Sequence, residues 1–170
     1  MSQLVVRAMG DGDAAAVIDI YRAGIESGNA TFESRVPDWS AWTAGHMSHS
    51  RLVAVMDGQV VGWAALAPVS RRDVYRGVAE VSIYVAPEAG GKGIGTRLMA
   101  ALIESAEKEG IWTLQASIFD ENRASQQLHR KHGFREIGRR ERIGLMSHGP
   151  YAGRWRDTIF LERRSKEVGV

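Results

Sequence analysis

The stretch from Glu80 to Glu109 constrains the fold more than any other part of this chain. Apolar and polar residues alternate up to Val85, as in a half-buried strand, and Pro87 ends that pattern. Four glycines follow within six positions, and apolar residues then recur every fourth position as far as Gly110. The glycines are Gly90, Gly91, Gly93 and Gly95. The pattern predicts a strand, a glycine turn and a helix, with free backbone N–H groups at the helix start that suit an anion.

The glycine spacing fits neither of two common phosphate loops. A P-loop needs Lys and Ser or Thr directly after its last glycine, whereas Lys92 precedes Gly93 and Gly95. A Rossmann fingerprint reads G-x-G-x-x-G in an early βαβ unit, whereas the spacing from Gly91 is G-x-G-x-G, deep in the chain. The sequence therefore predicts a phosphate site that is neither a P-loop nor a Rossmann dinucleotide site.

Composition indicates one soluble domain over residues 1–170. Hydrophobic residues make up 44% and charged residues 25%, and no apolar run approaches the length of a membrane span. The first residues lack the basic and apolar regions of a signal peptide, so we expect a cytoplasmic protein. With no cysteine and a net charge of +2, the sequence predicts no metal site, no disulfide, no nucleic-acid partner and no membrane partner.

The rest of the chain predicts further strands and three further helices. The turn at Asp57-Gly58 is the strongest hairpin signal. The helix before Gly133 has only Ala124 and Leu128 as apolar positions, so we expect most of it to be exposed or to contact a ligand. The expected strands are 4–8, 51–56, 59–66, 113–119, 135–145 and 154–161, and the expected helix caps are Asp11 or Asp13, Asp38 or Ser40, and Asp120 or Asn122.

Two motifs resemble a known family. The glycine turn is similar to a loop written Q/R-x-x-G-x-G/A, in which Gly93 and Gly95 match and Gly90 replaces the usual Gln or Arg. The later helix is similar to the pattern N-x-x-(A/S)-x-x-x-Y-x-x-x-G-F, with His129 at the tyrosine position and matches at Asn122, Ser125, Gly133 and Phe134. Both patterns belong to the GNAT N-acetyltransferase superfamily, whose glycine loop binds the acyl-CoA pyrophosphate.

Three further features resemble one branch, the phosphinothricin and methionine sulfoximine acetyltransferases. Glu80 precedes an S-x-Y-V stretch, His129 stands in an L/M-H-x-x-x-G-F/Y stretch, and Trp155 stands in a G-x-W-x-D stretch. The resemblance runs from the Thr31-Phe32 loop to Trp155. It implies an α/β (α+β) GNAT fold with a mixed, mainly antiparallel twisted sheet of six to seven strands and about four helices. It also implies a homodimer that transfers an acetyl group from acetyl-CoA to a small amine.

The resemblance also implies which residues hold acetyl-CoA. Backbone groups of one strand would pair with the pantetheine arm, the glycine turn would hold the pyrophosphate, and two residues of the later helix would contact the pantetheine and the phosphates. In that order these residues are Ile83, Tyr84 and Val85; Gly91, Lys92, Gly93, Ile94, Gly95 and Thr96; and Asn122 and Lys131.

Glu80 and His129 are the predicted catalytic residues. A free amine is mostly protonated at neutral pH, so Glu80 would accept its proton directly or through water. His129 would protonate the departing thiolate or assist the base, and a backbone N–H around Val85 would stabilise the oxyanion. A structural alternative for Glu80 is a salt bridge with Arg72 or Arg76 at the strand end.

The expected acceptor site has two polar ends and an apolar wall between them. Arg72 and Tyr75 would bind carboxylate or phosphinate oxygens, beside Glu80, and Phe32 would line the apolar part. Alternatively, the arginines of this segment are surface charges of a loop. Two other functions stay open: a protein or peptide N-acetyltransferase, and a non-catalytic acyl-CoA-binding module.

Overall fold

One seven-stranded sheet organises residues 3–170, the part of the chain that the computed structural model describes. The strand order is β1-β2-β3-β4-β5-β7-β6. Every neighbouring pair is antiparallel except β4 and β5, which are parallel. The strands are β1 (Leu4–Ala8), β2 (Leu52–Met56), β3 (Gln59–Pro68), β4 (Val78–Val85), β5 (Thr113–Phe119), β6 (Arg135–Leu145) and β7 (Trp155–Arg164). The predicted mixed, mainly antiparallel sheet is confirmed.

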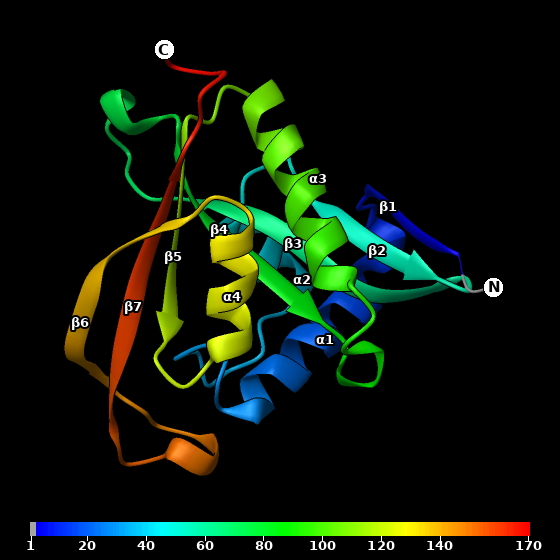
Figure 1. Cartoon of the computed structure of the whole chain (residues 1–170). Coiled ribbons are helices and arrows are strands. Elements are labelled where there is room, and N and C mark those ends of the chain that lie inside the picture. The colour runs from blue at the N-terminus through cyan, green and yellow to red at the C-terminus, as the bar shows by residue number, and fades with distance from the viewer. Residues whose placement is uncertain (1–2) are drawn as a thin grey trace.

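Four α-helices cover the sheet in the described chain (Figure 1). They are α1 (Ala14–Ser27), α2 (Trp39–Gly45), α3 (Ile94–Lys108) and α4 (Arg123–Lys131). Helices α3 and α4 lie on one face of the sheet and α1 and α2 on the other. Within residues 3–170, none of the helices combines the length and the apolar character needed to cross a membrane.

Helix ends follow the local sequence at most of the expected positions. Asp38 accepts a hydrogen bond from the Ala41 N–H at 2.8 Å, and Asn122 caps α4 in the same way. Gly28 ends α1 in the left-handed conformation, with φ of 66°. Asp13 occupies the cap position of α1, but its carboxylate pairs with Arg7 at 2.8 Å and caps no helical N–H.

Helix α4 differs from the sequence expectation because it buries polar side chains. Gln126 is 1% exposed and His129 is 2% exposed, although only apolar residues were expected to face inward. The Gln126 amide donates to the carbonyls of Phe119 and Asp120 at 3.1 and 3.0 Å. Burial of the Gln126 amide is tolerated because its N–H groups have these partners. By contrast, α3 buries its predicted apolar face, Ile94, Leu98, Leu102 and Ala106.

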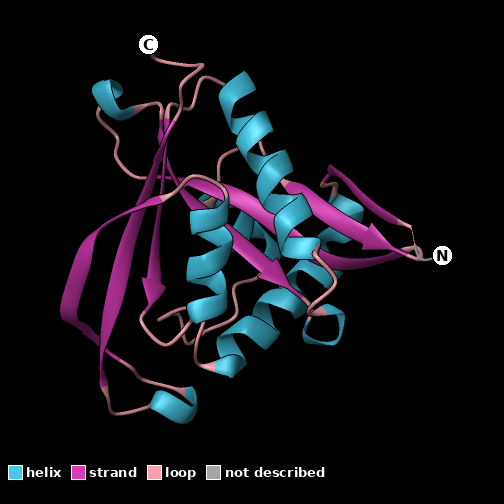
Figure 2. Cartoon of the chain, viewed as in Figure 1, coloured by secondary structure: helices cyan, strands magenta, loops and turns pink. Residues whose placement is uncertain are grey.

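Strands β4 and β5 pair over only three residues each and then separate. The paired segments are Val78–Glu80 and Thr113–Gln115. Figure 2 shows the two strands diverging, with helices on both sides of the sheet. The divergence leaves one edge of each strand without a strand partner in the middle of the sheet. This opening positions the candidate site.

Candidate active site

A cleft of about 560 Å³ lies where β4 and β5 separate. Glu80, Ile83 and Tyr84 line it from β4, and Ser117 and Phe119 line it from β5. Helix α4 and its N-cap contribute His129, Ser125 and Asn122. The loop after α1 contributes Ala30, Thr31, Phe32 and Glu33, and strands β6 and β7 contribute Arg140, Ile143 and Thr158. The cleft therefore joins residues from both faces of the sheet.

Backbone groups of β4 divide between β3 and the cleft. The Ala86 N–H donates to the Val61 carbonyl at 2.8 Å, which places the backbone groups of Ala86 on the β3 side. Because these directions alternate along a strand, the groups of Tyr84 also face β3, and those of Ile83 and Val85 face the opening. Ile83 and Val85 can therefore pair with an extended ligand. The backbone of Tyr84, expected to do the same, instead pairs with Trp63.

The Tyr84 side chain belongs to an aromatic cluster beside the cleft. Its ring stacks on Trp63 at 4.9 Å and meets Tyr21 edge to face at 5.0 Å. Burial raises the pKa of the Tyr84 hydroxyl well above its usual value. The hydroxyl therefore stays protonated at neutral pH and presents a neutral wall to the cleft.

The glycine turn has the geometry of an anion site. Gly91 and Gly93 have φ of 77° and 74°, a region that side chains rarely adopt. Gly93 caps α3 without a side-chain hydrogen bond, so the first-turn N–H groups have no acceptor within the helix. A Cβ at Gly95 would lie 3.2 Å from Leu128, so this glycine lets α3 and α4 approach closely. Gly90, with φ of −57°, has an ordinary conformation.

The remaining predicted CoA residues lie near this turn or further along α4. Lys92 is exposed, and Ile94, which is 1% exposed, anchors the turn in the core. Thr96 lies in the first turn of α3. Lys131 is exposed in the last turn of α4, one turn beyond Leu128, and forms no ion pair with the described residues.

Glu80 does not form the salt bridge that a structural role would require. Its exposed carboxylate accepts a long hydrogen bond from Gln115 at 3.4 Å and pairs with no cation among residues 3–170. Arg76 pairs with Asp73 at 3.3 Å and lies over the Trp112 ring at 5.5 Å. The carboxylate of Glu80 is therefore available to a ligand in the cleft.

His129 is a buried, neutral imidazole with one free lone pair. Its Nδ1 lies 2.7 Å from the Ser125 carbonyl, and because a carbonyl only accepts, Nδ1 carries the proton. Nε2 is buried and has no partner among the described residues. Burial lowers the pKa of His129 below its ordinary value. Nε2 therefore keeps a free lone pair at neutral pH, from which it can accept a hydrogen bond or a proton from a group in the cleft.

Asn122 ties the start of α4 to the loop after α1. Its Oδ1 accepts from the Ser125 N–H at 3.2 Å, and its Nδ2 donates to the Asn29 carbonyl at 3.0 Å. One N–H of the amide remains for a ligand in the cleft. Asn122 therefore positions the site as well as lining it.

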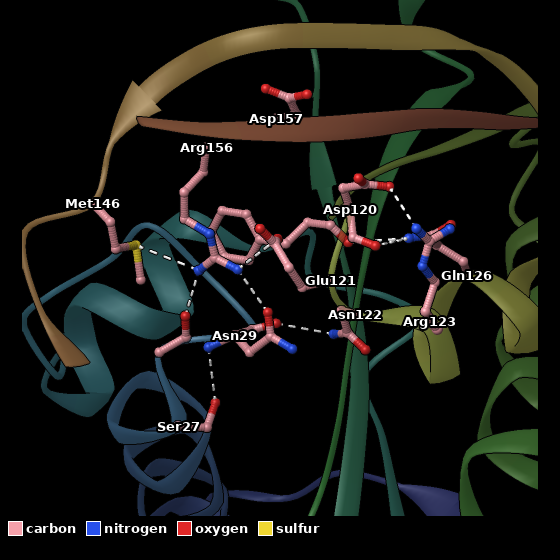
Figure 3. Close-up of polar contacts among 12 residues, drawn as sticks. Ser27, Asn29, Asp120, Glu121, Asn122, Arg123, Gln126, Met146, Arg156 and Asp157 are labelled. Atoms are coloured by element: carbon pink, nitrogen blue, oxygen red, sulfur yellow. Dashed lines mark hydrogen bonds and ion pairs between the residues drawn. The ribbon is translucent and has the colours of Figure 1, made fainter. Parts of the chain in front are cut away.

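Arg156 of β7 is a buried cation that the sequence did not reveal as part of the site (Figure 3). Its guanidinium donates to the Gly28 carbonyl, to Asn29 Oδ1 at 2.7 Å and to Glu121 Oε2 at 3.0 Å. Its Cζ lies 3.5 Å from the centre of the Phe119 ring and 4.0 Å from that of Tyr151. Arg156 thus fixes the segments that lead into the Ala30–Glu33 loop and into α4. No sequence motif identified this role, because it depends on contacts more than 100 residues apart.

The predicted acceptor residues separate in space. Phe32 lines the cleft and packs edge to face on Phe119 at 4.7 Å. Arg72 and Tyr75 are exposed on the segment between β3 and β4 and do not line the cleft. Arg140 of β6, for which the sequence predicted no role in the site, does line it. Within residues 3–170, no cluster of three or more His, Cys, Asp or Glu side chains has the arrangement of a metal site.

Comparisons with known proteins agree with this geometry. The model of the acetyltransferase (GNAT) family matches residues 15–134. A phosphinothricin N-acetyltransferase of Alcaligenes faecalis is 34% identical over 93% of this chain and 81% of its own length. An L-methionine sulfoximine/L-methionine sulfone acetyltransferase of Pseudomonas aeruginosa is 31% identical over 92% of each chain.

A solved structure extends the similarity to the fold. The phosphinothricin acetyltransferase of Sinorhizobium meliloti in complex with AcCoA superposes with a TM-score of 0.85 and 32% identity. The match covers 98% of this chain and 90% of the other.

Proposed function

Because the chain belongs to the GNAT acetyltransferase family, and is thus an acetyl-CoA-dependent N-acetyltransferase, we propose that it acetylates the α-amine of a small amino-acid analogue. Phosphinothricin, methionine sulfoximine and methionine sulfone are the candidate acceptors. The observation that carries this proposal is the cleft, in which an unpaired Glu80 and the free backbone edge of β4 line the same cavity.

The acyl-CoA side of the site is built from backbone groups. Acetyl-CoA supplies an activated acyl group, and the N–H groups of Gly91 to Thr96 would hold its pyrophosphate. The free edge of β4 at Ile83 and Val85 would pair with the pantetheine arm, and Asn122 would donate its remaining N–H to it. Lys131, exposed on α4, would reach the phosphates. Such positioning of two reactants can supply about 7–11 kcal/mol of barrier lowering.

Proton removal from the amine falls to Glu80. Its carboxylate is unpaired and lines the cleft, so it can accept the proton directly or through a water molecule. His129 would assist, because its free Nε2 accepts a proton at neutral pH. The Val85 N–H, which faces the opening, would donate to the carbonyl oxygen as negative charge develops there. Phe32 would form the apolar wall of the acceptor site.

Release of CoA thiol across a panel of amines tests the proposal. We expect turnover with at least one of the three amino-acid analogues to exceed turnover with lysine, polyamines and an N-terminal peptide. Equal or better turnover of the peptide would favour a protein N-acetyltransferase instead. The homodimer implied by the family resemblance remains a proposal, which analytical ultracentrifugation tests.

A further inference from the structure

Strand register places Arg140 on the same face of the sheet as Glu80. Arg140 pairs with Thr158 of β7, and Thr158 pairs with Phe119 of β5. Phe119 and Gln115 are four residues apart and so share a face, and Gln115 pairs with Glu80. Directly paired residues point to the same side of a sheet. The base and this arginine therefore flank one surface.

Arg140 is the one Lys or Arg side chain of residues 3–170 that lines the cleft. Its Cζ lies over the Phe160 ring at 4.5 Å, and its guanidinium has no hydrogen-bond or acidic partner in the described chain. The neighbouring Arg139 points to the other face and pairs with Asp120 and Asp157, each at 2.9 Å. Arg140 thus carries an uncompensated positive charge at the cleft.

A second free donor stands beside this charge. Thr158 is 5% exposed and lines the cleft, and its Oγ1 has no hydrogen-bond partner among the described residues. Buried hydroxyl groups usually have a partner. The hydroxyl and the guanidinium together can bind an oxyanion, since both donate hydrogen bonds.

Spacing between the two charges suits a small molecule. Phe160, under the guanidinium, pairs with Ser117 of β5, and β5 neighbours β4. Because β4 and β5 stay paired only as far as Gln115, two strand spacings of about 4.8 Å are a lower bound, and the guanidinium lies at least roughly 10 Å from β4, from which Glu80 projects on the same face. An acceptor with an amine and an oxyanion a few bonds apart would bridge that interval.

Building on the proposed function, we propose that Arg140, with Thr158, binds the oxyanion group of the acceptor. The group is the α-carboxylate or, in phosphinothricin, the phosphinate at the end of the side chain, and both present anionic oxygens as hydrogen-bond acceptors. Arg140 would thus determine specificity, because peptides and polyamines lack an anion at this distance from the reacting amine.

Steady-state kinetics of Arg140→Gln test this inference. We expect KM for the acceptor to rise about 10- to 100-fold, the effect of losing charge-assisted hydrogen bonds. KM for acetyl-CoA and the melting temperature should stay unchanged, since Arg140 is exposed and unpaired. Arg140→Lys should recover part of the loss. The matched control is Arg135→Gln on the same strand, whose guanidinium pairs with Glu162 away from the cleft.

Acceptor analogues distinguish the two oxyanions. If the α-carboxylate binds, wild-type protein should prefer methionine sulfone over its amide, and Arg140→Gln should lose that preference. If the side-chain end binds, the variant should lose more affinity for phosphinothricin, which carries a phosphinate charge, than for the uncharged sulfone.

Three results would overturn the inference. These are an unchanged acceptor KM in Arg140→Gln, an equal loss in the Arg135→Gln control, and a rise confined to acetyl-CoA. In each case active wild-type protein would leave the proposed function intact. Wild-type protein that acetylates none of the analogues would reject the proposed function and this inference together.

Discussion

Replacing Arg156 with Met should destabilise the protein and loosen the acceptor side of the cleft. The change keeps an unbranched side chain between Phe119 and Tyr151 but removes the donors to Gly28, Asn29 and Glu121. Breaking a buried ion pair by removing one partner costs about 3–5 kcal/mol. The Glu121 side chain is 43% exposed, so water can replace part of its loss, but the Gly28 carbonyl loses a buried donor.

A free energy of unfolding lower by about 4 kcal/mol is therefore expected. For a domain of this size, 1 kcal/mol corresponds to about 2–4 °C, so thermal unfolding should shift down by roughly 8–16 °C. Asn29 leads into the Ala30–Glu33 loop, so KM for the acceptor should rise more than KM for acetyl-CoA in protein that remains folded. Arg156→Lys should be intermediate, because Lys keeps the charge but lacks the planar fork.

Arg154→Met provides the matched control. Arg154 is exposed on the same segment and forms no ion pair with the described residues, so its loss should change stability by less than about 0.5 kcal/mol. Equal unfolding temperatures of the two Met variants, or equal changes of both KM values in Arg156→Met, would contradict this role of Arg156.

Three further predictions concern the turn, the base and the buried imidazole. Gly93→Leu should abolish acetyl-CoA binding in calorimetry while unfolding stays cooperative. The reason is that a side chain at φ of 74° is strained and would occupy the place of the phosphate. Unchanged binding would reject the turn as the pyrophosphate site. Glu80→Gln should lower kcat/KM by about 10²–10⁴ and alter the acidic limb of the pH–rate profile, and an unaltered profile would move the base role to His129 or to water. Burial lowers the pKa of His129, so the unfolded chain binds more protons there than the folded one. Stability should therefore decrease as the pH falls below the unfolded value of about 6.5, and urea unfolding at pH 7.5 and 5.5 should show a smaller decrease in His129→Gln; identical decreases would contradict this.

Local patterns predicted most of the fold because they act over a few residues. The period of α3, the glycines of its turn and the Asp57-Gly58 hairpin specify their elements without help from distant contacts. The burial of His129 was not predictable in this way, since the segment has few apolar residues and its inward face depends on carbonyls of other elements.

Only the part of the candidate site that one continuous stretch of sequence forms was predictable. Glu80 and the glycine turn stand in one continuous stretch; Glu80 lines the cleft, and the turn begins α3 shortly after β4 ends. The position of Arg140 depends on the register between β6 and β7, which the sequence does not fix because this pairing contains two register shifts. The role of Arg156 depends on its contact with Gly28, which is distant in sequence. Arg72 and Tyr75 were expected to bind the acceptor, but neither residue lines the cleft.

A one-pot competition among amines tests whether the protein acetylates small amino-acid analogues in preference to other amines. Wild-type protein receives acetyl-CoA with equal concentrations of methionine sulfone, phosphinothricin, lysine and a short peptide with a free N-terminus, and mass spectrometry identifies the acetylated products and the acetylated atom. The proposed function predicts that an amino-acid analogue acetylated on its α-amine dominates the products, and that Glu80→Gln suppresses its formation. A dominant acetylated peptide, or product formation that Glu80→Gln leaves unchanged, would contradict it.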